Sequence, residues 1–419
     1  KNGDSWIART AAVGTQDDDA NGTDAVADES TIATTCDDGR IILDNGLLRA
    51  IIAPDGTVRS LIDLDNGHEL VPDGSGIGHY ELLRDEPYEW DAWDIQRDAF
   101  LSAEGIDDSH VERVTETKRG GATVHVSSTA DGVSIDACIT LRPKSKSLEF
   151  RTKVDWRASE RFLKVDIPIA IQADRAQYEC QYGMVERPIQ KNTRSDEAKY
   201  ESCTHRFVRV ADAGYAAAVV NASTYGSDVS PIHRNTASGP VRGTMIRLSL
   251  LSSPLYPDPN TDKGVHEFAW NVVADASMPA VLDEANRLNV AVLPAVPAFD
   301  PLAQLNPVDG VMVLDWVKLA DDGSGDLILR VYEAVGGEAH ARLAVNAALG
   351  KATVRECSIM EDARLDAELP AAFADGDPSV ARTAQGAMLS LHPFQLATLR
   401  VSCGSDGGNT DGNESGSLR

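Results

Sequence analysis

The protein has 419 residues and a mass of 44.9 kDa, and its 39 Lys and Arg oppose 65 Asp and Glu, a net charge of −26. A phosphate backbone would repel such a surface, so we expect no nucleic-acid partner, and an anionic membrane is excluded for the same reason. No apolar run approaches the ~20 residues that span a bilayer. With 42% apolar and 25% charged residues, the composition is typical of a soluble globular chain.

Cysteine usage predicts reduced thiols. The six cysteines form no CxxC pair and no Cys/His cluster at zinc spacing, and a chain of this length needs no disulfide framework. The opening residues 1–6 also lack the apolar segment of a signal peptide. We therefore expect a cytoplasmic protein.

The two ends are expected to lack fixed structure. Residues 1–39 are rich in Asp, Ala, Thr and Gly and predict a flexible acidic linker, because they cannot bury enough apolar surface to offset their ordering entropy. Residues 404–419 are rich in Gly, Ser, Asn and Asp and predict a disordered tail.

Between the ends, alternation with a period of two dominates and predicts strands. Residues 47–53 and 58–64 flank Asp55-Gly56 and read as a hairpin. Residues 133–141, 148–156 and 163–169 alternate apolar with polar side chains, which is typical of strands with one buried and one wet face. Helices are scarce: residues 280–288 are the best candidate, and residues 196–200 predict one turn.

A second block of strands begins near Leu288. The proline-rich stretch 293–307 joins it to the first block, and residues 311–314 and 327–332 are expected to pair across the turn at 321–326. Further strands are predicted at 341–345, 353–359, 387–391 and 395–401. The predicted fold is all-β, with a large β domain over residues 40–288 and a small β-sandwich over residues 289–403.

The densest cluster of functional residue types is at 84–98, with Trp90, Asp91, Trp93 and Asp94 at its centre. Indole rings cover the apolar faces of sugars and carboxylates bind their hydroxyls, so the cluster suits carbohydrate. A structural loop that caps a sheet edge remains the alternative. Asp91 and Asp94 could serve as a glycosidase pair, but 65 acidic residues make such a pair common by chance.

A second polar island runs from residue 186 to 206 and includes Glu186, Arg187, Asn192 and Arg194. It is either a solvated excursion between strands or a loop that reaches a substrate cleft or a neighbouring domain. The nine histidines form no HxD, HxH or HExxH motif, so no metal site is expected within the chain. GxSxG and phosphate-binding glycine motifs are also absent. The residues alone do not name a reaction.

Several segments in series resemble the C-terminal half of glycoside hydrolase family 38 α-mannosidases, closest to the bacterial and cytosolic branch. Order and spacing agree over residues 40–403. The segments that carry the resemblance are Asp44-Asn45-Gly46-Leu47, Asp85-Glu86-Pro87, residues 90–95, Glu186-Arg187-Pro188, His205-Arg206-Phe207, Leu248-Ser249-Leu250-Leu251, Pro257-Asp258-Pro259, Arg330-Val331-Tyr332-Glu333 and Pro393-Phe394.

The resemblance implies a mutarotase-like β supersandwich followed by a small β-sandwich. It also implies that catalysis resides in a preceding α/β barrel, which supplies a zinc ion, an Asp nucleophile and an acid/base carboxylate for retaining hydrolysis of terminal α-mannosides. No catalytic residue is then expected in this chain, and its partners are the missing N-terminal catalytic domain and mannose-containing oligosaccharides. The loops at 90–94 and 186–194 are expected to face that domain.

Two other functions remain open from the sequence. A stand-alone carbohydrate-binding or scaffolding β protein would use the same domains without hydrolysis. A complete supersandwich enzyme, such as an epimerase or lyase, would need a convergent His with a carboxylate or Tyr on a concave face. A face left exposed without the barrel would be apolar and would favour a homo-oligomer.

Overall fold

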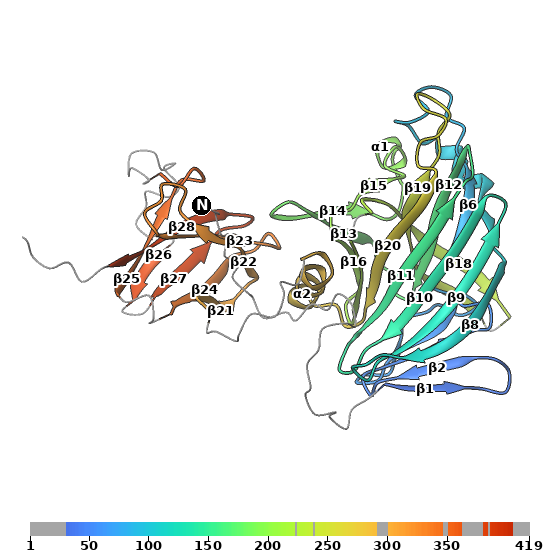
Figure 1. Ribbon diagram of the computed structural model, residues 1–419, viewed down its shortest axis with the longest axis horizontal. Helices are drawn as coiled ribbons and strands as arrows, with labels where there is room; N and C mark the ends of the chain where they lie inside the picture. Colours follow the sequence, from blue (N-terminus) through green and yellow to red (C-terminus); the bar gives the residue numbers. More distant parts are fainter. Residues whose placement is uncertain are drawn as a thin grey trace, which may run out of the picture. The chain divides into compact units, whose positions relative to one another are not determined.

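The computed structural model describes residues 31–222, 224–237, 239–290, 301–346, 351–362, 380–383 and 386–404. These residues divide into two compact units, 31–290 and 301–404. Both are built almost entirely from strands, which confirms the all-β fold class (Figure 1). The tail at 405–419 and the first 30 residues lie outside the described part of the chain.

The first unit holds three antiparallel sheets. The five-stranded sheet has the order β1 (Ile32–Thr35), β2 (Ile41–Asp44), β3 (Leu48–Ile52), β4 (Val58–Asp63) and β5 (His68–Glu69). The nine-stranded sheet has the order β14 (Gly183–Pro188), β13 (Arg175–Cys180), β16 (Phe207–Ala211), β17 (Ala216–Asn221), β20 (Gly264–Val273), β11 (Ser147–Trp156), β10 (Val133–Leu141), β9 (Ala122–Ala130) and β8 (Asp108–Glu116). Its long strands β8 to β11 run side by side in Figure 1.

The third sheet of this unit carries the polar side chains that matter below. Its order is β15 (Ser202–Cys203), β18 (Gly226–Thr236), β19 (Gly239–Ser252), β12 (Arg161–Ile169), β6 (His79–Arg84) and β7 (Glu104–Gly105). The core of the unit is continuous and takes side chains from all three sheets. At its centre the rings of Phe150 and Trp270 stack 3.8 Å apart.

The second unit consists of two four-stranded sheets with a core of their own. One sheet has the order β21 (Ala303–Asp309), β24 (Ala339–Val345), β27 (Gly386–Leu391) and β26 (Val380–Thr383); the other has the order β22 (Met312–Leu319), β23 (Leu327–Glu333), β28 (Leu396–Gly404) and β25 (Lys351–Cys357). Strands β22 and β23 pair antiparallel, as the turn at 321–326 predicts.

The helices of the described residues are short. They are the 3₁₀ helix η1 (Arg97–Ser102), α1 (Arg194–Glu197) and α2 (Met278–Asn289). Helix α2 includes the predicted 280–288 segment; the side chain of Ser277 accepts a hydrogen bond from Ala280 N at its start, and Val281, Leu282 and Ala285 are buried. None of the described helices is long and apolar enough to cross a membrane.

Two expectations need correction. Strand β1 lies within the predicted linker at 1–39, where Thr31 donates to the carbonyls of Gly120 and Leu141. Its side chains are exposed, so backbone pairing with β2 orders a segment that offers no apolar pattern. Strand β12 was expected to have one wet face, but its alternate residues Lys164 and Asp166 are buried as well. Another part of the chain covers that face.

Candidate functional site

An exposed aromatic loop connects β6 to β7. Its residues 85–103 include η1, and the side chains of Tyr88, Trp90 and Trp93 are 81%, 66% and 68% exposed. The backbone of Trp90 has a φ of 63°, a conformation that bulky residues rarely adopt, and its carbonyl accepts the N–H groups of Trp93 and Asp94. The two indoles meet edge to face with centroids 6.5 Å apart. The turn therefore presents a pair of apolar rings to solvent.

The segment 194–201 supports this loop. The Tyr200 hydroxyl donates to the Ile95 carbonyl at 2.5 Å, and the Tyr200 ring meets the Phe100 ring edge to face. Arg97 also forms an ion pair with Glu197 at 3.4 Å. The loop and the C-terminal half of the 186–206 island are thus one assembled surface.

The residues singled out in the sequence occupy different parts of this surface. Asp94 accepts hydrogen bonds from Ile95 N and the Gln96 side chain, and Asp91 lies three residues earlier in the same loop. Arg194 is the exposed first residue of α1, and the Thr193 side chain accepts a hydrogen bond from Asp196 N at its start. Asn192 is exposed beside this cap.

Glu186 and Arg187 lie apart from these contacts, on strand β14 of the β13–β14 hairpin. Glu186 pairs with Arg175 at 3.3 Å and accepts a hydrogen bond from Gln177, both on β13. The Arg187 guanidinium lies 5.9 Å from the Tyr178 ring centroid. The contacts of both side chains are therefore within their own hairpin.

Beneath the loop, a ladder of charged side chains crosses the six-stranded sheet. Cross-strand register places His79, Asp166, Arg247 and Asp228 in one row and Glu81, Lys164 and Ser249 in the next. Residues opposite each other share a face of the sheet, so one face is polar across four strands. We call these seven residues the charged ladder.

Lys164 is the most deeply buried member of the ladder, with a fully buried side chain. Its Nζ lies 2.9 Å from Glu201 Oε2, 2.9 Å from Asp228 Oδ2 and 2.8 Å from Ser249 Oγ. The rings of Phe100 and Phe162 lie over the ammonium group, with centroids 5.0 and 4.8 Å from Nζ. Phe100 of the aromatic loop therefore closes the ladder from above.

Arg247 occupies the neighbouring row. It donates to Asp228 through Nε and Nη2 and to Glu81 through Nη1, and its guanidinium lies 5.3 Å from the Phe100 ring centroid. Burial would lower the pKa of Arg247, but the Asp228 and Glu81 carboxylates raise it above its usual value. Burial and the charge of Asp166 raise the pKa of Glu81.

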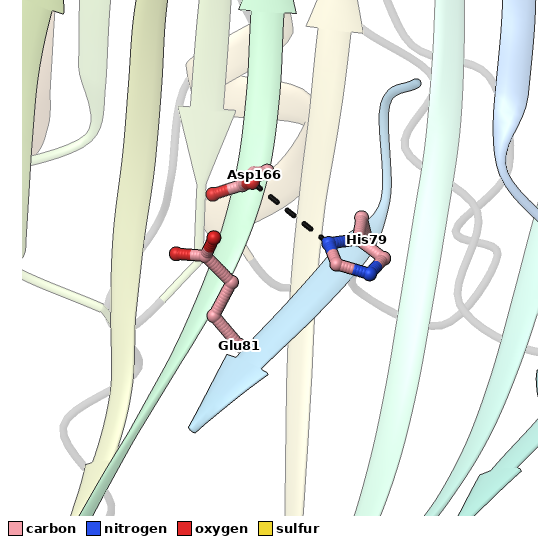
Figure 2. Close-up of side chains that lie close together, drawn as sticks. All are labelled: His79, Glu81 and Asp166. Atoms are coloured by element: carbon pink, nitrogen blue, oxygen red, sulfur yellow. Dashed lines mark ion pairs between the residues drawn. The ribbon is translucent and has the colours of Figure 1, made fainter. Parts of the chain in front are cut away.

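His79 stands at the end of the ladder, close to Glu81 and Asp166 (Figure 2). A contact with Asp166 raises the pKa of His79, while burial acts in the opposite direction. This is the group of side chains, within the described residues, whose donor atoms converge as metal ligands would. The expectation of no metal site rests on motifs close in sequence and stays a prediction; it does not consider side chains that two strands, β6 and β12, bring together.

The charged ladder is not predicted from the sequence, although the residues carry a signal for it. Charged residues alternate with apolar ones on both β12 and β19, which alone reads as an ordinary wet face. Phe100 of the loop from β6 to β7 lies over Lys164 and Arg247, and Glu201 contacts Lys164. The pattern within a strand does not encode these contacts.

Comparisons with known proteins identify the family. Residues 43–260 match the model of the Glycosyl hydrolases family 38 C-terminal domain, and residues 312–399 match that of the family 38 C-terminal beta sandwich domain. The chain is 29% identical over 348 residues to human Alpha-mannosidase 2C1, covering 77% of this chain and 31% of that protein. It is 26% identical over 405 residues to Alpha-mannosidase of Saccharomyces cerevisiae, covering 88% of this chain and 36% of that protein.

Solved structures agree on the fold. A protein of glycosyl hydrolase family 38 from Enterococcus faecalis aligns with a TM-score of 0.65 at 15% identity, covering 90% of this chain and 45% of that one. An α-mannosidase from Enterococcus faecalis V583 aligns with a TM-score of 0.60, also at 15% identity, covering 86% and 42%. The chain spans about a third of the length of the curated relatives it matches. The order of motifs, the two β units and the family matches agree: the chain belongs to glycoside hydrolase family 38 and corresponds to its C-terminal β region.

Proposed function

We propose that this chain is the C-terminal portion of an exo-acting, retaining α-mannosidase that hydrolyses terminal α-mannosides of oligosaccharides. The observation that carries the proposal is the family match over both units, together with relatives that are named α-mannosidases and are about three times as long as the matched segment. In this proposal an N-terminal domain supplies the nucleophile, the acid/base carboxylate and the zinc ion.

The role of this chain is then to support and complete the cleft. The aromatic loop offers Trp90 and Trp93 as rings that can cover the apolar faces of a sugar or pack on the catalytic domain. The charged ladder holds the base of that loop through Phe100. Asp91, Asp94, Asn192 and Arg194 are the polar groups that we assign to the same surface, whereas Glu186 and Arg187 would contribute from the adjacent hairpin.

The cellular location belongs to the proposal as well. The cysteines at the described positions 36, 138, 180, 203 and 357 have free thiols, which supports a reducing, cytoplasmic compartment.

The decisive experiment compares residues 1–419 with the longer protein purified from its source, using an aryl α-mannoside as substrate. We expect no hydrolysis by residues 1–419, with or without added zinc, and turnover by the longer protein. Turnover by residues 1–419 would contradict the proposal. A source protein of 44.9 kDa would also contradict it.

A stand-alone carbohydrate-binding protein is the second candidate, and the exposed indole pair favours it. This candidate predicts that a mannose-containing oligosaccharide binds saturably to residues 1–419 in a calorimetric titration. It also predicts that no longer form of the protein hydrolyses the oligosaccharide. A source protein without an additional domain would favour this alternative.

A further inference from the structure

One end of the charged ladder brings an imidazole and two carboxylates together. One ligand atom from each of His79, Glu81 and Asp166 lies within 4.8 Å of the others. His79 and Glu81 are two residues apart on β6 and so share a face, and Asp166 is the cross-strand partner of His79 on β12. Figure 2 shows the three side chains converging on one space.

Asp166 is incompletely satisfied at this position. The residue is 9% exposed, and its Oδ1 is buried without a hydrogen-bond partner. Its other oxygen, Oδ2, lies 3.9 Å from His79 Nδ1. A buried carboxylate oxygen that has lost its water and gained no donor is costly, so the geometry points to a missing positive ligand.

The charge balance of the ladder points the same way. Three largely buried carboxylates of the ladder, those of Glu81, Asp166 and Asp228, together with the adjacent Glu201, face the two cations Lys164 and Arg247. Lys164 contacts Glu201 and Asp228, and Arg247 contacts Asp228 and Glu81. Neither Lys164 nor Arg247 forms an ion pair with Asp166. The carboxylates here outnumber these two cations, so Asp166 lies in a region of excess negative charge.

The far side of the imidazole ring faces the exposed carboxylate of Asp107. His79 Nε2 lies 3.4 Å from Asp107 Oδ1, so the ring can donate to a carboxylate while Nδ1 faces Asp166. Metal-binding histidines commonly have such a partner on their second nitrogen.

We propose that His79 Nδ1, Glu81 and Asp166 bind a divalent cation of the Zn²⁺ or Mn²⁺ class and that the ion links β6 to β12 at the His79 end of the charged ladder. One imidazole and two carboxylates suit these ions. Tetrahedral ligands at zinc distances are roughly 3.4 Å apart, so small side-chain rotations close the site. Arg247 donates to Asp228 through Nε and Nη2 and to Glu81 Oε2 through Nη1. Glu81 Oε1 can therefore bind the ion without breaking these hydrogen bonds. The inference does not depend on the proposed function.

The test uses the 419-residue chain, untagged and stripped with EDTA, titrated calorimetrically with ZnCl₂ and with MnCl₂. We expect saturable binding of a single ion by at least one of the two metals. Asp166→Asn and His79→Gln are expected to weaken it more than about 10-fold, and Asp107→Asn, which perturbs only the imidazole partner, about 10-fold. The matched control is His340→Gln, which removes another His–carboxylate pair, His340–Asp309 at 2.6 Å, and should leave the affinity unchanged.

Circular dichroism establishes that each variant is folded. A second readout needs no variant: Mn²⁺ should broaden the NMR signals of the His79 imidazole in the unmodified chain and spare those of His340. The proposal would be overturned if neither Zn²⁺ nor Mn²⁺ bound saturably to the unmodified chain. Unchanged metal affinity in the folded Asp166→Asn and His79→Gln variants would also overturn it. So would Mn²⁺ that broadens other NMR signals but not those of the His79 imidazole.

Discussion

Lys164 is the residue on which the charged ladder most depends. Its ammonium group is fully buried and is the shared partner of Glu201 and Asp228. Replacing it by methionine, Lys164→Met, keeps the length of the side chain but leaves Glu201 without a counter-charge and Asp228 with Arg247 alone. We expect a loss of about 3–5 kcal/mol in the free energy of unfolding, measured by urea denaturation.

The matched control is Lys153→Met, the same change at an exposed position of β11. It should alter the free energy of unfolding by no more than about 0.5 kcal/mol. If Lys164→Met were equally mild, the contacts of Lys164 with Glu201 and Asp228 would contribute little to the free energy of unfolding.

At the scale of elements, we expect the aromatic loop to contribute to ligand binding and little to the free energy of unfolding. The Trp93 side chain is 68% exposed, so Trp93→Ala should change the free energy of unfolding by about 0.5 kcal/mol or less. In the longer α-mannosidase that we propose, the same change should lower kcat/KM for an α-mannoside by at least 10-fold, because a stacked ring contributes on the order of 1.4 kcal/mol or more. Steady-state kinetics would measure this loss.

Trp316→Ala is the control for this prediction, since Trp316 is a half-exposed tryptophan of the second unit. It should leave kcat/KM unchanged. If Trp93→Ala and Trp316→Ala had the same kcat/KM, the proposed contact between the aromatic loop and the substrate would be wrong. The family assignment would not be affected.

Strand predictions from the sequence are accurate where the apolar residues of the alternating pattern are buried and the polar ones are accessible. Residues 133–141 alternate cleanly and form β10 at those bounds, since one face of that strand is buried and the other is mostly accessible. Strand β12 alternates equally well, yet both of its faces are buried, because Phe100 and the segment around Glu201 cover Lys164. Period two therefore predicts the strand but not what lies over it.

At the scale of the whole first unit, Asp63 connects the five-stranded and nine-stranded sheets. Its buried carboxylate, at the end of β4, contacts Lys146 Nζ at 3.1 Å and accepts a hydrogen bond from the Tyr215 hydroxyl at 3.0 Å. These two residues immediately precede β11 and β17. Burial would raise the pKa of Asp63, but Lys146 and Tyr215 lower it below its usual value.

A lowered pKa makes this connection sensitive to acid. Its stabilisation is fully present above the unfolded-state pKa of about 3.9 and is lost as the pH falls through the lower folded-state value. Asp63→Asn should therefore cost about 2 kcal/mol at pH 7, and the difference from the unmodified chain should shrink below about pH 4. Urea denaturation between pH 2.5 and 7 measures both.

Asp65→Asn serves as the control, because the half-exposed Asp65 contacts the same Lys146 at 2.7 Å. Its cost should stay below about 1 kcal/mol. A cost of Asp63→Asn that did not vary with pH would contradict the role given to its ionised form.

The sequence by itself determined the all-β class, most strands and the family, because apolar alternation, turn residues and the order of short motifs are all local features. The tertiary structure decided the rest: that residues 32–35 pair as a strand, that the β6–β7 loop lies on the segment 194–201, and that His79, Glu81 and Asp166 converge. The last group joins two strands some 85 positions apart in the chain, at residues 79–81 and 166. Cross-strand register and the covering loop bring such residues together, and neither is written in the spacing of residues along one strand.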